Sequence, residues 1–344
     1  MPREEFSKGE AAFLATPIRD LGLQIAGSPL EPILADFRAE LECVGIRRLR
    51  PHFYLSDEWG VPFGTTSIAI PFYLARPELT ALHAEQTGLV EGTSRADILR
   101  YLRHEMGHVV NYGYRLYEQE EWVKLFGAMT QPYEEEFRPE PWSRRFVIHL
   151  PGWYAQKHPD EDWSETFAVW MTPGLDWGAE YAGWPEALAK LEYCDRTLAA
   201  LRDRDPVATE VDLDAAAEEL PYSLQEYYRR QALAEAALPP GLDGSLRSIF
   251  EELGVPEDAT TTAPRRPASA LVRRLAPELT ANVYRWTGLF PERTRALLQQ
   301  LAERCDQLRQ VYPADREVPA AVALTTLVTA LAMNRVHRGS YAPQ

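Results

Sequence analysis

Two histidines four residues apart, with a glutamate directly after the first, are the side chains best suited to chemistry: His104, Glu105 and His108 in the segment HEMGH. On a helix, residues i and i+4 lie on one face about one turn apart, so both imidazoles can reach one metal ion. Glu105 would lie beside that ion, which suits a general base acting on water. The pattern predicts a Zn²⁺ site, and the simpler alternative is a polar patch on an ordinary helix.

A catalytic zinc ion takes three protein ligands, so a third ligand must come from another segment. Residues 158–174 predict a second helix, with Pro159 at its first position. Glu165 lies in the middle of this helix among aromatic residues, where an unpaired buried carboxylate would be costly. The acids at 160–162 have another explanation, because negative charge stabilises the first turn of a helix. We therefore expect Glu165 to be the third ligand, with residues 160–162 as the alternatives.

Three more side chains near this second helix could donate a hydrogen bond to an oxyanion that develops during a reaction. They are Tyr154, His149 and His158. We expect a catalytic role for Tyr154 and His158. Packing, or support of neighbouring ligands, explains each of the three equally well.

The HEMGH segment lies on a helix predicted over residues 93–113. Ser94 and Asp97 form a capping box, apolar residues recur at helical spacing, and Gly113 can end the helix. Gly107 in the helix interior costs about 1 kcal/mol relative to alanine. Either another segment approaches the backbone closely at Gly107, or the glycine is simply tolerated.

The rest of the first half predicts a small sheet, whereas the second half is helical. Residues 50–57 and 66–75 are rich in β-branched and aromatic residues and predict two strands, the second with an edge that could pair with an extended peptide. After Pro206 we find helical patterns and no strand signal. We therefore predict an α+β fold: a domain over 1–205 with a small sheet and the HExxH helix, then an all-α domain over 206–344.

The composition narrows the classes of function. The net charge of −15 argues against nucleic acid as the main partner, because phosphate binding needs a basic surface. Three widely spaced cysteines favour a reducing compartment, and the first residues show no signal peptide, so we expect a cytoplasmic protein. The longest apolar tract, residues 320–333, is too short to span a bilayer and predicts a buried helix, so we expect no membrane partner.

Several longer blocks resemble the bacterial family of zinc-binding metallopeptidases. The blocks are LGLQIAGSPLEPIL, LSDEWG, IAIPFYLA, LRHEMGHVVNYGYRL, SRRFVIHLPGWYAQKHPDEDWSETFAVW and YAGWPEALAKLEYCD, and together they fall within residues 20–200 or so. The resemblance implies a zincin-type catalytic domain of the glutamate-ligand kind, a gluzincin. It also implies His104, His108 and Glu165 as the zinc ligands and Glu105 as the base.

These observations predict a zinc-dependent hydrolase, specifically a metallopeptidase that cleaves peptides or proteins with Glu105 as general base. Two alternatives stay open. One is a non-catalytic, zinc-stabilised binding or scaffolding protein, with the helical region of residues 206–344 as its surface for a protein partner. The other is a zinc hydrolase that acts on a non-peptide amide.

Overall fold

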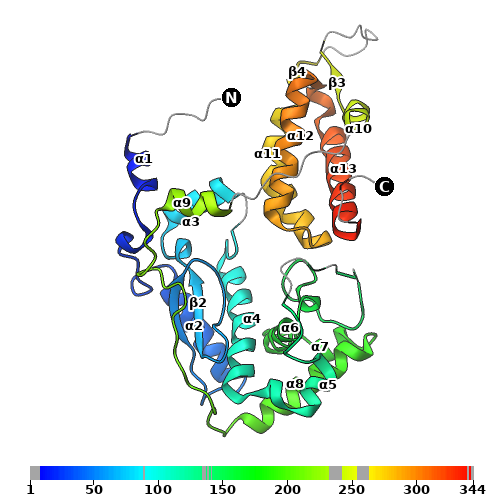
Figure 1. The fold of residues 1–344 in the computed structure, drawn as a ribbon. Coiled ribbons are helices and arrows are strands. Elements are labelled where there is room, and N and C mark those ends of the chain that lie inside the picture. Colours follow the sequence, from blue (N-terminus) through cyan, green and yellow to red (C-terminus); the bar gives the residue numbers. More distant parts are fainter. Residues whose placement is uncertain are drawn as a thin grey trace. The chain divides into compact units, whose positions relative to one another are not determined.

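The chain forms two compact units in the computed structural model, which describes residues 8–87, 90–133, 137, 139–140, 142–231, 242–253, 263–338 and 341. The first unit comprises Met1–Gln86 and Val90–Arg230, and the second comprises Thr87–Leu89 and Gln231–Gln344 (Figure 1). Helices dominate both units and each has a small sheet, so the fold is a mixed, α+β one.

The first unit contains nine α-helices and two strands among its described residues. In chain order they are α1 (Lys8–Leu14), α2 (Leu30–Cys43), β1 (His52–Ser56), β2 (Ser67–Pro71), α3 (Pro77–Thr87), α4 (Arg95–Tyr114), α5 (Glu120–Phe126), α6 (Pro159–Met171), α7 (Trp177–Glu180), α8 (Pro185–Leu201) and α9 (Leu224–Gln231). Short 3₁₀ turns join several of them, among them η2 (Phe72–Ala75) after β2 and η4 (Tyr154–Gln156) before α6.

Helix α4 carries the HEMGH segment in its second half. Its start agrees with the prediction, since the side chain of Ser94 accepts a hydrogen bond from the backbone N–H of Asp97. Its end does not, because the helix continues past Gly113 and stops at Arg115, whose φ of 50° puts it in the left-handed region. Every residue from His104 to Gly113 is buried, so this part of α4 lies inside the unit.

The backbones of α4 and α6 approach each other closely at Gly107. A Cβ at this position would lie 2.6 Å from the Cα of Ser164, a distance that real Cβ atoms do not show. The indole N–H of Trp163 also donates to the carbonyl oxygen of Gly107 over 2.7 Å. Of the two explanations for this glycine, close approach of another segment is therefore the one observed.

We expect Gly107→Ala to lower the free energy of unfolding by about 1–3 kcal/mol, because overpacking against the backbone of α6 outweighs alanine's better helix propensity. The measurement is urea unfolding of the metal-free protein, followed by tryptophan fluorescence. Gly183→Ala is the matched control, since a Cβ there would meet nothing within 4 Å. Equal stability of the two variants would contradict the close contact between α4 and α6.

The sheet of the first unit has the two predicted strands, but the strand expected to offer a free edge has a neighbour on each side. Strands β1 and β2 pair in parallel, with His52 opposite Ser67, and Ala69 of β2 also donates its backbone N–H to the carbonyl of Gly60. The chain between the strands thus passes along the second edge of β2. All five residues of β2 are buried. At Ala69 the edge expected to pair with a peptide is therefore occupied by Gly60 of the chain itself, and peptide pairing with the strand at 66–75 stays a prediction.

The boundary between the units lies later than residue 205, because the segment that follows is bonded to the first unit. The backbone N–H of Val207 donates to the carbonyl of Gly113, and that of Ala217 donates to Leu55 in β1. Further along, the Tyr227 hydroxyl donates to the Asp57 carbonyl. Residues 206–230 therefore complete the first unit, and the predicted split at 205/206 is corrected to 230/231.

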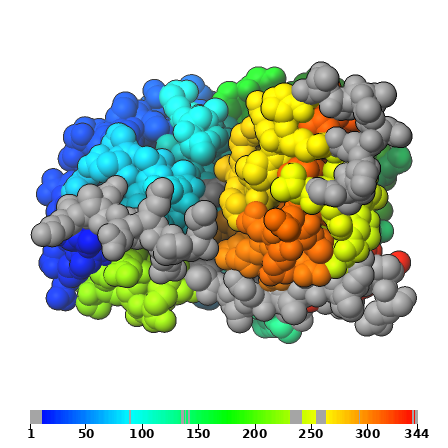
Figure 2. Space-filling view, turned by 90° about the horizontal axis from the view of Figure 1, so that it is seen from above, coloured from blue at the N-terminus to red at the C-terminus, as the bar shows by residue number. Residues whose placement is uncertain are grey.

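The second unit is not all-α. Its elements are α10 (Leu242–Ile249), β3 (Glu251–Glu252), β4 (Arg265–Pro267), α11 (Ala268–Thr287), α12 (Pro291–Gln307), β5 (Gln310–Pro313) and α13 (Glu317–Arg338). The three strands form an antiparallel sheet in the order β3-β5-β4. The sequence does not predict these strands, because segments of two to four residues are too short to show an alternation of apolar and polar side chains. In Figure 2 the yellow and orange surfaces of α11 and α12 adjoin, and these two helices pack closely.

Helix α13 extends beyond the predicted apolar tract at both ends. Among the described residues, the stretch Ala314–Arg338 is the one helix long and apolar enough to cross a membrane, so the expectation that this tract is too short does not hold. One face of α13, including Leu324 and Val328, packs in the apolar core of the second unit. Only 28% of its apolar window is buried, so the expected buried helix is buried along one face alone; one such helix is weak evidence for a membrane span.

Candidate metal centre

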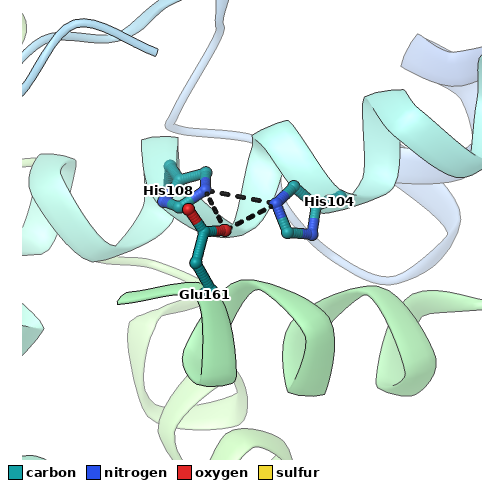
Figure 3. A group of neighbouring side chains, drawn as sticks. All are labelled: His104, His108 and Glu161. Carbon is teal, nitrogen blue, oxygen red and sulfur yellow. Dashed lines mark hydrogen bonds and ion pairs between the residues drawn. The ribbon is translucent and has the colours of Figure 1, made fainter. Parts of the chain in front are cut away.

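Two imidazoles from α4 and one carboxylate from α6 meet at a single point. His104 Nε2 lies 3.0 Å from Glu161 Oε2 and 3.3 Å from His108 Nε2, and His108 Nε2 lies 3.3 Å from the same Glu161 oxygen (Figure 3). All three residues are buried. Polar side chains that are shielded from water and point their ligand atoms at one spot are the arrangement expected of a metal site built between two helices.

The three distances fit the donor set of a zinc ion. Zinc binds histidine nitrogen and carboxylate oxygen at about 2.0–2.2 Å in a tetrahedral arrangement, so neighbouring ligand atoms lie about 3.3–3.5 Å apart. The separations of 3.0, 3.3 and 3.3 Å come close to one face of that tetrahedron. Three protein donors leave the fourth position open, as catalytic rather than structural zinc sites do.

The other nitrogen of each imidazole is bonded to a second carboxylate of α6. His104 Nδ1 lies 2.9 Å from Glu165 Oε1, and His108 Nδ1 lies 2.9 Å from Asp160 Oδ2. These contacts make Nδ1–H the donor and leave both Nε2 atoms for a metal ion. Metal-binding histidines are oriented in this way by outer carboxylates, which also increase the basicity of the ligand nitrogen.

The outer carboxylates are themselves held. Asp160 accepts hydrogen bonds from Asn111 Nδ2, over 2.7 Å, and from the Tyr112 hydroxyl. Glu165 Oε2 accepts the backbone N–H groups of His149 and Leu150, both over 2.9 Å. The site therefore continues into a network that fixes each imidazole ring.

The geometry places Glu161, not Glu165, at the two Nε2 atoms. Glu165 is fully buried and lies behind His104, where it serves as the hydrogen-bond partner of Nδ1. The expectation of Glu165 as third ligand is therefore corrected. Asp160, in the same first turn as Glu161, serves His108 in the same way. The first-turn acids have the expected position for partners of the helix dipole, and that explanation concealed the contacts of Asp160 and Glu161 with α4.

One signal in the sequence could have identified the pair. Glu161 and Glu165 are spaced i, i+4, as are His104 and His108, so two acids on one helix face can meet two imidazoles on another. Asp160 contacts His108 while Glu165 contacts His104, so α6 runs opposite in direction to α4. Spacing alone does not tell which nitrogen each acid meets.

Asp162, the last of the first-turn acids, has a different partner. Its Oδ2 lies 2.6 Å from the Nζ of Lys190 on α8, and both side chains are buried. Burial raises the pKa of Asp162 to about 7, although Lys190 opposes that shift. Asp162 therefore takes part in a buried ion pair that attaches α6 to α8, away from the metal ligands.

The electrostatics of the cluster favour protonated imidazoles when no cation is bound. Burial alone lowers the pKa of His104, but hydrogen bonds to Glu161 and Glu165 outweigh it and raise that pKa to about 9. The pKa of His108 is also raised despite burial, chiefly by Asp160 and Glu161. The same contacts lower the pKa of Glu161 well below its usual value, against the effect of burial. A divalent cation bound by the two Nε2 atoms and Glu161 would replace the Nε2 protons and leave the Nδ1–H groups in place.

Glu105 lies next to the cluster without being part of it. The side chain is buried and lines the same cavity as His104, His108 and Glu161. Burial raises its pKa, while the two imidazoles oppose the shift. A carboxyl group whose pKa is raised toward neutrality is better suited to accept and return a proton than an ordinary one.

The three oxyanion candidates have different surroundings. Tyr154 lines the cavity, and its ring centroid lies 5.5 Å from that of His104. His158 caps α6: its Nδ1 accepts from the backbone N–H of Asp160 and its Nε2 bonds to the carbonyl of Gln131. His149 Nε2 bonds to the carbonyl of Arg100, and burial lowers its pKa to about 4. Tyr154 and His158 both line the cavity, but both ring nitrogens of His158 already bond to the backbone.

Tyr133 is a site residue that the sequence did not indicate. Its hydroxyl donates to Glu161 Oε1 over 2.6 Å and lies 3.4 Å from the Tyr154 hydroxyl. The Nζ of Lys157 lies 4.3 Å from the centre of the Tyr133 ring. Tyr133 comes from an irregular loop with no periodic pattern, so no motif could identify it.

A cavity of about 820 Å³ opens onto the cluster. Its volume is within the range of sites that enclose small molecules or peptide segments. Residues from the β1–β2 connection, from α4, from the loop after α5 and from the start of α6 line it. The candidate metal centre therefore lies in a space large enough for a substrate.

Part of the chain matches a described protein family. No curated protein and no solved structure matches the chain. Residues 81–176, which include all of α4 and α6 and therefore every residue of the candidate metal centre, match the family described as "Putative zinc-binding metallo-peptidase".

Proposed function

We propose that this chain is a zinc-dependent peptidase, a zincin of the glutamate-ligand kind. The observation that carries the proposal is the buried cluster of His104 Nε2, His108 Nε2 and Glu161 Oε2, with Glu105 beside it in the cavity. These three side chains would hold the ion, and the description of the matching family supports both zinc binding and peptidase activity.

A zinc ion held by His104, His108 and Glu161 would supply Lewis acidity, which would lower the pKa of a water molecule to about 7 and polarise a carbonyl group. The Glu105 carboxylate then takes the proton of the attacking water and later delivers it to the leaving amine nitrogen. Glu165 and Asp160 keep the two imidazoles oriented by accepting their Nδ1–H groups.

Tyr154 is the candidate donor to the oxyanion that forms on the substrate carbonyl. Its ring packs beside His104, and its hydroxyl lies close to that of Tyr133, so two phenol groups border the cluster on one side. Hydrogen-bond donors placed where charge develops lower the reaction barrier. His158 is left out of this role because both of its ring nitrogens bond to the backbone.

The substrate class proposed is peptides or proteins, in a reducing cytoplasmic compartment. Cys43, Cys194 and Cys305 are all free thiols, and two of them are buried. The role of the second unit as a surface for a protein partner stays a prediction.

Protein purified without chelator should contain about one equivalent of zinc by elemental analysis, and exposure to a diverse peptide library should yield cleavage products by mass spectrometry. Zinc is expected to be lost in His108→Ala and retained in His52→Ala, whose side chain is exposed on β1. A metal-free protein that fails to bind added zinc would disprove the metal centre. A zinc-loaded protein that cleaves nothing would favour the binding-protein alternative.

A further inference from the structure

Apolar and aromatic side chains line part of the cavity. We refer to five of them as the aromatic end: Phe63, Tyr112 and Tyr117, whose rings contact one another, and Val123 and Met129, which line the same cavity. Phe63 comes from the β1–β2 connection, Tyr112 from α4, and the others from the chain after α4. Residues distant in sequence thus share one wall.

Ring contacts run without interruption from the candidate metal ligand to the surface. The ring centroids of His108 and Tyr112 lie 6.0 Å apart, those of Tyr112 and Phe63 lie 5.0 Å apart at 66°, and those of Phe63 and Tyr117 lie 5.6 Å apart. The aromatic end is therefore directly continuous with the site where a bond would be cleaved.

Two apolar side chains of the aromatic end are exposed to solvent. Phe63 is 65% exposed and Val123 is 37% exposed, although both line a cavity. Tyr112 is buried, and its hydroxyl already donates to Asp160, so it needs no polar partner from a ligand. Exposed apolar side chains grouped beside a polar centre are typical of a surface that binds another molecule.

The aromatic end itself contains no positively charged side chain, since Lys157 Nζ lies over the rings of Tyr133 and Tyr154, which line the cavity but are not members of this end. Among the described residues that line the cavity, none is lysine or arginine, whereas Glu105, Asp160 and Glu161 are acidic. A substrate side chain with a carboxylate, or a free carboxyl terminus, would find no basic side chain within the aromatic end. An uncharged apolar group that packs against the rings would gain free energy from burial of its surface, and no unpaired charge would be buried with it.

We propose that the aromatic end is a specificity pocket for an aromatic or large aliphatic side chain of the peptide substrate, next to the bond that is cleaved. This inference rests on the proposed function, because the metal centre sets where the cleaved bond lies. Phe63 is the residue that determines specificity most strongly, since its ring is the most exposed member and contacts two of the other rings.

The test compares two zinc-binding compounds on the zinc-loaded protein by isothermal titration calorimetry: 3-phenylpropanohydroxamic acid and acetohydroxamic acid. Both bind zinc through the same group, and they differ in the phenyl-bearing chain. We expect the phenyl compound to bind at least about tenfold more tightly, because even one methylene in an apolar pocket contributes about tenfold or more. Phe63→Ala should remove most of this preference.

Val211→Ala is the matched control, because Val211 is an exposed apolar residue of the same unit, 55% exposed, that does not line the cavity. It should keep the preference of the parent protein. Equal affinity for the two compounds, or a preference unchanged by Phe63→Ala, would overturn the pocket while the metal centre stands. Absence of binding by both compounds would overturn the metal centre and the pocket with it.

Discussion

Glu105→Gln is expected to lower kcat by roughly 10²–10⁴-fold while the protein keeps its zinc, because an amide cannot accept the proton of the attacking water. Glu105 lines the cavity but lies outside the cluster of three donor atoms, so its loss leaves the metal ligands intact. The measurement pairs elemental analysis of zinc with the rate of cleavage of a peptide identified in the library screen.

Glu192→Gln is a suitable control for this substitution, because Glu192 is an exposed glutamate on α8. It should keep both zinc and activity. If Glu105→Gln cleaves as fast as the parent protein, Glu105 is not the base. If it loses zinc, Glu105 is a metal ligand and not the base.

Glu161→Ala is expected to weaken zinc binding more than any other substitution of an acid in α6, because it removes the carboxylate oxygen at the two Nε2 atoms. Glu165→Ala and Asp160→Ala each remove an outer partner of one imidazole, which typically costs about 10–100-fold in affinity. The measurement is competition with a chromogenic chelator at fixed pH, with circular dichroism to verify folding.

Glu161→Gln has nearly the shape of the parent side chain. A loss of zinc in this variant therefore cannot come from a cavity such as alanine would leave. This variant too should bind zinc more weakly than Glu165→Gln. The opposite order, with Glu165 variants losing zinc and Glu161 variants retaining it, would return the third-ligand role to Glu165 and contradict the geometry of the cluster.

Local signals were sufficient for the two helices of the site. The N-cap at Ser94 and the apolar stripe predicted α4, and Pro159 with acids in the first turn predicted α6. These are short-range effects: a capping hydrogen bond, a pre-set φ angle and a charge near a helix end act within a few residues. The spacing of His104 and His108 likewise follows from the helical repeat alone.

Local signals do not report pairing between segments distant in sequence. Two predictions that were wrong, the unit boundary and the all-α second unit, depend on such pairing. Residues 206–230 show no local reason to belong to the first unit, yet their backbone bonds to β1 and to the end of α4 hold them there. Strands β3, β4 and β5 are each two to four residues long and exist only because they pair with one another. Sheet pairing depends on partners distant in sequence, which periodicity cannot locate.

The sequence by itself determined the chemistry available: two imidazoles on one helix face, a glutamate beside them, and several acids on a second helix. The tertiary structure decided which acid lies at the Nε2 atoms and which acids bond to the Nδ1 atoms. Gly107 lets α6 approach α4 backbone to backbone, and the opposite direction of the two helices brings Glu161 to both Nε2 atoms, Glu165 to His104 Nδ1 and Asp160 to His108 Nδ1. Helix spacing sets which side chains share a face, but only the packing of one helix on another sets which atoms meet.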